Sequence, residues 1–73
     1  MTTLNDDVVV SVNGQDRRVS PGTTVAMLVA ELPGRGRGTA VARNAEVVPR
    51  SQWSTTTLGD QDRVEILGAA QGG

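Results

Sequence analysis

The chain has 73 residues, with 8 acidic and 7 basic side chains and a formal net charge of −1. This length allows one domain, and a charge balance so close to zero excludes binding to nucleic acid or anionic lipid that is driven by the field of the whole chain. Histidine, cysteine, tyrosine and lysine are absent, so carboxylates are the only side chains left for acid–base work, which argues against a self-sufficient enzyme and excludes a thiolate metal site.

The first predicted element is a β-hairpin. Residues 7–12 form a run rich in β-branched side chains that ends in Asn13-Gly14. Both of these residues tolerate positive φ, as a type I′ turn requires, so residues 15–19 are expected to return antiparallel to the first strand.

A short amphipathic helix is predicted over residues 25–32. Its apolar face follows the spacing i, i+3, i+4 and i+7: Val25, Leu28, Val29 and Leu32. Thr23 or Thr24 offers a hydroxyl as N-cap, and Pro33-Gly34 stops the helix. The stripe is interpreted as ordinary core.

A glycine-rich stretch carrying Arg35 and Arg37 follows the helix. Two arginines without aromatic neighbours provide neither base stacking nor many phosphate contacts, so an exposed loop is favoured over a nucleic-acid contact. The stretch also lacks the Lys-Ser/Thr pair of a P-loop.

The remaining pattern predicts strands. Residues 39–43 and 46–48 should pair around Asn44-Ala45, and residues 63–67 form the last strand after a turn at 59–62. Trp53, the only aromatic residue, is interpreted as a packing anchor. Hairpins with one helix on one face predict an α+β two-layer domain over residues 1–73, with residues 1–6 disordered and residues 68–73 a flexible functional tail.

The chain ends in Gln71-Gly72-Gly73. Two residues without Cβ can thread a narrow channel, which would leave the carboxylate of Gly73 accessible to a partner enzyme. The alternative is a frayed terminus with no role. No segment approaches the length of a membrane span, and residues 1–7 do not resemble a signal peptide, so a cytoplasmic protein without a membrane partner is expected.

Several segments together resemble the ThiS family of ubiquitin-like, β-grasp sulfur carrier proteins. They are Val12-Asn13-Gly14, Gly22-Thr23-Thr24-Val25, Glu46-Val47-Val48-Pro49-Arg50-Ser51-Gln52-Trp53, residues 60–66 and Gln71-Gly72-Gly73. The resemblance covers nearly the whole chain from Val8 onward. It implies a mixed sheet of four to five strands packed on one main helix.

The resemblance also implies a function in thiamine biosynthesis. An E1-like adenylyltransferase of the ThiF type would use ATP and magnesium to adenylate the Gly73 carboxylate. Sulfur from a persulfide donor would then displace AMP, and a thiazole synthase of the ThiG type would take the sulfur from the thiocarboxylate. The carrier itself would bind no cofactor and would be a co-substrate of these enzymes.

Other functions share the diglycine. The chain could carry sulfur for molybdopterin, cysteine, tRNA or natural-product thiolation, or it could be a ubiquitin-like protein modifier. A passive β-grasp interaction domain would not use its terminus at all.

The chain departs from the family pattern in two turns and in one strand. Ala45 and Gln61 stand where the family commonly has glycine, and each costs about 1 to 2 kcal/mol if its φ is positive. Arg43 replaces a usually apolar residue. If the face of Ala40 and Ala42 seats the helix, then Val41 and Arg43 lie on the helix-free face.

That assignment would place Val41, Arg43 and Leu67 near the tail, as a partner-docking patch that continues into Gln71, Gly72 and Gly73. The competing interpretation is a set of scattered surface residues.

Overall fold

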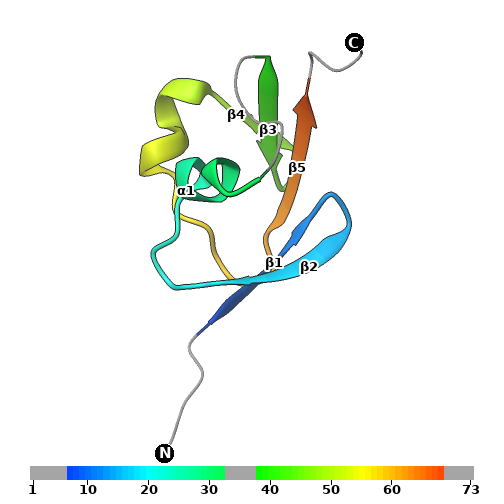
Figure 1. The fold of residues 1–73 in the computed structure, drawn as a ribbon, viewed down its shortest axis with the longest axis vertical. Helices are drawn as coiled ribbons and strands as arrows, with labels where there is room; N and C mark the ends of the chain where they lie inside the picture. The colour runs from blue at the N-terminus through cyan, green and yellow to red at the C-terminus, as the bar shows by residue number, and fades with distance from the viewer. Residues whose placement is uncertain (1–6, 33–37, 69–73) are drawn as a thin grey trace, which may run out of the picture.

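The computed structural model describes residues 7–32 and 38–68 (Figure 1). The predictions for residues 1–6, for Arg35 and Arg37, and for residues 69–73 lie outside this described part. The elements in chain order are β1 (Val8–Val12), β2 (Gln15–Val19), α1 (Val25–Ala30), β3 (Thr39–Arg43), β4 (Glu46–Val48), the 3-10 helix η1 (Arg50–Thr55) and β5 (Arg63–Gly68).

The strands form one mixed sheet in the order β2-β1-β5-β3-β4. The pairs β1–β2, β3–β4 and β3–β5 are antiparallel, whereas β1 and β5 are parallel. The last strand therefore lies in the centre of the sheet (Figure 1). β2, β3 and β4 have their predicted bounds, while β1 starts one residue later and β5 continues to Gly68.

Helix α1 begins as predicted and ends early. The Thr24 Oγ1 accepts a hydrogen bond from the Met27 N–H at 3.3 Å, so Thr24 is the N-cap. The prediction that the helix runs to residue 32 is wrong, because α1 ends at Ala30. The N–H groups of Glu31 and Leu32 donate three residues back, a tightening typical of a helix end. A residue before proline also disfavours helical backbone, and Leu32 precedes Pro33.

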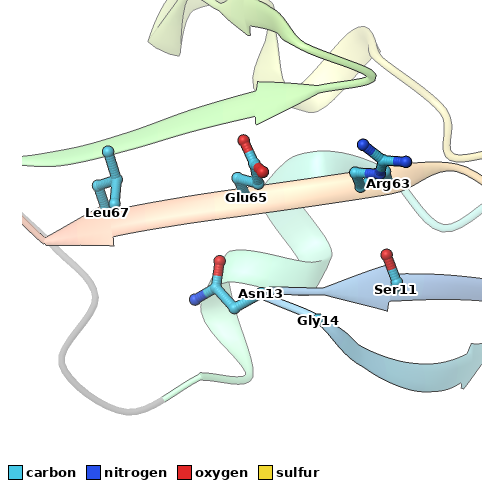
Figure 2. A pocket seen from close by; sticks show the side chains of 6 residues that line it. All are labelled: Ser11, Asn13, Gly14, Arg63, Glu65 and Leu67. Atoms are coloured by element: carbon cyan, nitrogen blue, oxygen red, sulfur yellow. The ribbon is translucent and has the colours of Figure 1, made fainter.

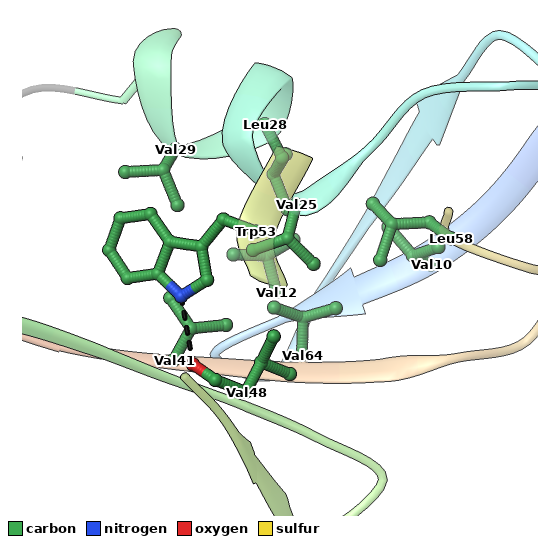
Figure 3. Packing of buried hydrophobic residues seen from close by; sticks show 10 residues of the cluster. All are labelled: Val10, Val12, Val25, Leu28, Val29, Val41, Val48, Trp53, Leu58 and Val64. Carbon is green, nitrogen blue, oxygen red and sulfur yellow. Dashed lines mark hydrogen bonds between the residues drawn. The ribbon is translucent and has the colours of Figure 1, made fainter. Parts of the chain in front are cut away.

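The core lies between the sheet and the two helices (Figure 3). Its buried members are Val10, Val12, Val25, Leu28, Val29, Val41, Val48, Trp53, Leu58 and Val64. Trp53 comes from η1, a helix that the polar sequence of this stretch did not predict. Its ring packs in the core and its Nε1 donates to the Val48 carbonyl at 2.8 Å, which confirms Trp53 as a packing anchor.

The predicted face of β3 is wrong. Val41 is only 1% exposed and pairs with Ile66 on the helix side, whereas Ala40 and Ala42 lie on the helix-free face. A two-residue period fixes which residues share a face but not which face is buried. The branched Val41 fills the space under the helix better than two alanines would, because protein cores are packed without sizeable voids.

Candidate functional site

Strand β5 is the last described element before the C-terminal residues 69–73. Gly68, the last residue of this strand, pairs with Thr39 of β3. The predicted site residues Gln71, Gly72 and Gly73 lie outside the described residues. The geometry that bears on them is therefore that of β5 and of the strands on its two sides.

The helix-free face of the sheet carries exposed apolar side chains near the end of β5. Leu67 is 69% exposed and pairs with Ala40 across β3–β5, and Val47 is 76% exposed and pairs with Ala42 across β3–β4. We call these four residues the outer-face patch. Glu65, which pairs with Ala42 from the other side, adds a negative charge.

The structure separates the three residues predicted to form a docking patch. Leu67 lies on the helix-free face as predicted, while Val41 lies in the core. Arg43 lies half-buried at the end of β3, where its Nη1 is 3.1 Å from Asp62 Oδ2, so it does not belong to the exposed patch either. Val47 was missed. The alternation in β4 could have identified it, because a buried Val48 requires an outward Val47.

A shallow groove runs between β1 and β5 on the helix-free side (Figure 2). It is lined by Ser11, Asn13, Gly14, Arg63, Glu65 and Leu67. Three side chains of β5 line this groove in the order Arg63, Glu65 and Leu67, so that it is positively charged at the start of β5, negatively charged in the middle and apolar at its end. The groove ends in Leu67, so it is continuous with the outer-face patch.

Two asparagines hold β5, one at each end. Asn13 Oδ1 accepts from the Ile66 N–H at 2.8 Å, and its Nδ2 donates to the Ile66 carbonyl at 3.1 Å. Asn44 Oδ1 accepts from the Arg63 N–H at 2.9 Å, and its own N–H donates to the Arg63 carbonyl at 2.7 Å. Both asparagines have φ of 52° and start tight hairpin turns. The sequence predicted the turns but not their contacts with β5.

Asp62 ties the start of β5 to its neighbours. Its carboxylate accepts from the Gly59 N–H at 2.7 Å, from Asn44 Nδ2 at 3.0 Å and from Arg43 Nη1 at 3.1 Å. Burial raises the pKa of Asp62, but the hydrogen bonds from Gly59, Asn44 and Arg43 and the charge of Arg43 outweigh burial and leave this pKa lowered.

The two turns that lack the family glycines keep a positive φ. Ala45 has φ of 72° and Gln61 has φ of 71°. The turn containing Gln61 also reaches β1, because the Gln61 N–H donates to the Val9 carbonyl at 2.7 Å and Asp60 Oδ1 accepts from the Val9 N–H at 2.9 Å. These turns have therefore not changed type to suit their side chains.

Metal binding and membrane crossing find no support in the described residues. Among them, no group of three or more histidine, cysteine, aspartate or glutamate side chains could hold a metal ion. No helix within the same residues is long and apolar enough to cross a membrane.

A mixed five-stranded sheet with one α-helix on a single face and its last strand in the centre defines a β-grasp protein. The model of the ThiS family matches residues 4–73. The chain belongs to the ThiS family, as its resemblance implied.

Relatives of known structure and name agree with this assignment. The thiamine biosynthesis protein (ThiS) from Geobacter metallireducens superimposes with a TM-score of 0.76 at 30% identity, over 90% of this chain and 100% of that one. The sulfur carrier protein ThiS of Escherichia coli K12 is 34% identical over 61 residues, which span 84% of this chain and 92% of that protein. The predicted β-grasp fold is confirmed.

A third relative is a larger protein. The thiazole synthase of Paramagnetospirillum magneticum is 39% identical over 62 residues, which span 85% of this chain but only 19% of the synthase. The similarity therefore concerns one segment of that protein.

Proposed function

We infer that the chain is a sulfur carrier protein of thiamine biosynthesis. The observation that carries this conclusion is the ThiS family match over residues 4–73, supported by the similarity to the Escherichia coli sulfur carrier along nearly its full length. The fold is compatible with this role. The central strand β5 ends at Gly68, only five residues before Gly73, where the sulfur would be carried.

We propose that the sulfur is carried on the carboxylate of Gly73. A carboxylate is a poor electrophile, so an E1-like adenylyltransferase of the ThiF type would first join it to AMP, releasing pyrophosphate from ATP. The terminal sulfur of a persulfide donor would then attack the acyl carbon and expel AMP, and reduction of the resulting acyl disulfide by a thiol would release the thiocarboxylate. ATP and magnesium belong to the partner, and the carrier itself binds no cofactor and is not an enzyme.

The outer-face patch is the proposed docking surface for the adenylating partner. Leu67 and Val47 are large, apolar and exposed, and Leu67 lies one residue before the end of β5. A partner docked on this face would therefore be in contact with the chain close to the start of the C-terminal residues 69–73. This patch replaces the predicted set that included Val41 and Arg43, and it retains Leu67.

A thiazole synthase of the ThiG type is the proposed sulfur acceptor. The similarity of this chain to a segment of the Paramagnetospirillum magneticum thiazole synthase supports a physical association of the two functions. Transfer of the sulfur to that enzyme would return the Gly73 carboxylate for another cycle.

The decisive test is the intact mass of the purified chain after incubation with ATP, a ThiF-type enzyme, a persulfide source and a thiol reductant. The expected result is a mass gain equal to replacement of one oxygen by sulfur, mapped to Gly73 by fragmentation. No gain with an enzyme that activates another ThiS carrier in parallel would contradict the proposal and favour a protein modifier or a passive domain.

A further inference from the structure

Asn13 completes the hydrogen-bond ladder between β1 and β5. These strands are parallel, and the ladder includes the bonds from Ser11 N–H to the Asp62 carbonyl at 3.0 Å and from Asn13 N–H to the Val64 carbonyl at 2.9 Å. In a ladder that continued, the Ile66 N–H would donate to the main-chain carbonyl of residue 13, and the Ile66 carbonyl would accept from the N–H of residue 15.

The main chain of β1 cannot supply these two groups. It turns away at Asn13-Gly14, where φ is 52° and 86°, and Gln15 pairs with Val12 instead. The carboxamide of Asn13 takes their place, accepting from the Ile66 N–H at 2.8 Å and donating to the Ile66 carbonyl at 3.1 Å. A carboxamide can do this because it has the donor and acceptor of a peptide group.

The position of this contact is what gives it meaning. Ile66 lies two residues before Gly68, where β5 ends, and Asn13 lies beside the part of β5 that carries Glu65, toward the Leu67 end of the groove (Figure 2). On the β3 side, pairing continues to Gly68. Within the described residues, the Asn13 carboxamide is the last group that holds β5 from the β1 side.

We propose that Asn13 is a positioning residue for activation of the Gly73 carboxylate. This inference rests on the proposed function. By holding β5 from its second side, Asn13 fixes the end of this strand, five residues before Gly73, relative to the outer-face patch. A partner docked on that patch then meets the carboxylate over a smaller range of positions.

The physical reason is entropic. Adenylation needs the carboxylate oxygen in line with the reacting phosphate of ATP, and each conformation that misses this geometry lowers the rate. Loosening the end of β5 on the β1 side should therefore lower kcat, while the affinity for the partner should not change, because Leu67 of the outer-face patch stays paired with Ala40 of β3. A residue that only stabilises the turn would not separate these two quantities.

Two substitutions disrupt the contact and keep the turn, Asn13→Gly by removing both hydrogen bonds and Asn13→Asp by placing a carboxylate oxygen against the Ile66 carbonyl. Asn13→Gly removes the carboxamide, and Asn13→Asp removes its N–H donor, while Gly-Gly and Asp-Gly both remain favourable in a type I′ turn. Asn44→Gly is the matched control. It removes the equivalent side-chain contact from the start of β5, in a turn with the same φ of 52°, and leaves the end of β5 untouched.

The test measures pyrophosphate exchange by a ThiF-type enzyme with each full-length carrier, the Kd of each complex, and amide hydrogen exchange of each free carrier. Asn13→Gly and Asn13→Asp should lower kcat by about tenfold at unchanged Kd. Asn13→Gly should also lose protection of the Ile66 N–H, whereas Asn13→Asp should keep it, because the carboxylate still accepts from that N–H. Asn44→Gly should keep the wild-type kcat and lose protection at Arg63 instead.

Wild-type kcat in both Asn13 variants, or an equal loss of kcat in Asn44→Gly, would overturn the inference while leaving the proposed function in place. A loss of affinity that accounts for the whole effect would also overturn it. If the wild-type chain is not adenylated by a partner that activates another ThiS carrier, the proposed function fails, and the inference fails with it.

Discussion

Trp53 and Val48 are joined by a buried hydrogen bond of 2.8 Å from the indole Nε1 to the main-chain carbonyl. This bond links η1 to the end of β4, and the guanidinium carbon of Arg50 lies 4.6 Å from the centre of the same ring. The Trp53 side chain therefore packs in the core, donates a hydrogen bond to a carbonyl of β4 and contacts the exposed Arg50 through its ring.

Replacing Trp53 by phenylalanine should lower the free energy of unfolding by about 2 kcal/mol, because the Val48 carbonyl loses its partner and the smaller ring leaves space. Urea unfolding followed by circular dichroism would measure it. Arg50→Gln is the control, since an exposed cation–π contact is worth about 0.5 to 1 kcal/mol. Equal losses in the two variants would contradict the role given to the indole.

Glycine at the positive-φ positions should stabilise the domain. Ala45→Gly and Gln61→Gly should each raise the free energy of unfolding by about 0.5 to 1 kcal/mol, because relief of the left-handed backbone exceeds the entropy that glycine adds to the unfolded chain. Ala42→Gly, within β3, is the control and should destabilise. Thermal unfolding of the three variants checks the sign, and a loss of stability at Ala45 and Gln61 would refute it.

Stability should fall in acid through Asp62. Its pKa in the folded protein is lowered from the ordinary value of 3.8, so the ionised form contributes stability that is complete above that value. This contribution is lost as the pH falls through the folded-state pKa. The stability difference between wild type and Asp62→Asn should therefore shrink from about pH 6 to about pH 2 in urea unfolding. A difference that stays constant over this interval would contradict the account.

Charge on the outer-face patch should weaken the complex with the adenylating enzyme. Leu67→Asp and Val47→Asp should each raise the Kd by about tenfold or more and leave the fold intact. Met27→Asp, a matched change at an apolar side chain 54% exposed on α1, should not. Val41→Asp should instead unfold the domain, because it buries a charge. Calorimetric titration and circular dichroism separate these outcomes.

One extra residue after Gly73 should abolish thiocarboxylate formation. The added residue moves the carboxylate away from the position that the partner's active site is built to accept, and its Cβ would not fit a channel shaped for glycine. Mass spectrometry after the complete reaction is the measurement. Sulfur incorporation into an alanine-extended chain at the wild-type rate would show that the terminus is not the reacting group.

Local chemistry was enough to predict most elements of the fold. Asn13-Gly14 and Asn44-Ala45 predicted both hairpins, and the apolar spacing from Val25 predicted a helix with a threonine cap. These features depend on interactions within a few residues, which the sequence displays directly. Helix η1 was missed because Trp53 is its one buried side chain and the rest of the segment is polar, with little apolar periodicity.

The sequence by itself determined the family, the α+β class and the diglycine on which the proposed chemistry depends. Only the tertiary structure decided that Val41 faces the core and Val47 the solvent, and that Asn13 and Asn44 hold β5 from both sides. Alternation along a strand shows which residues share a face of the sheet, but it does not show which of the two faces the helix covers. Likewise, 53 positions separate Asn13 from Ile66, and only the parallel pairing of β1 with β5 brings them together.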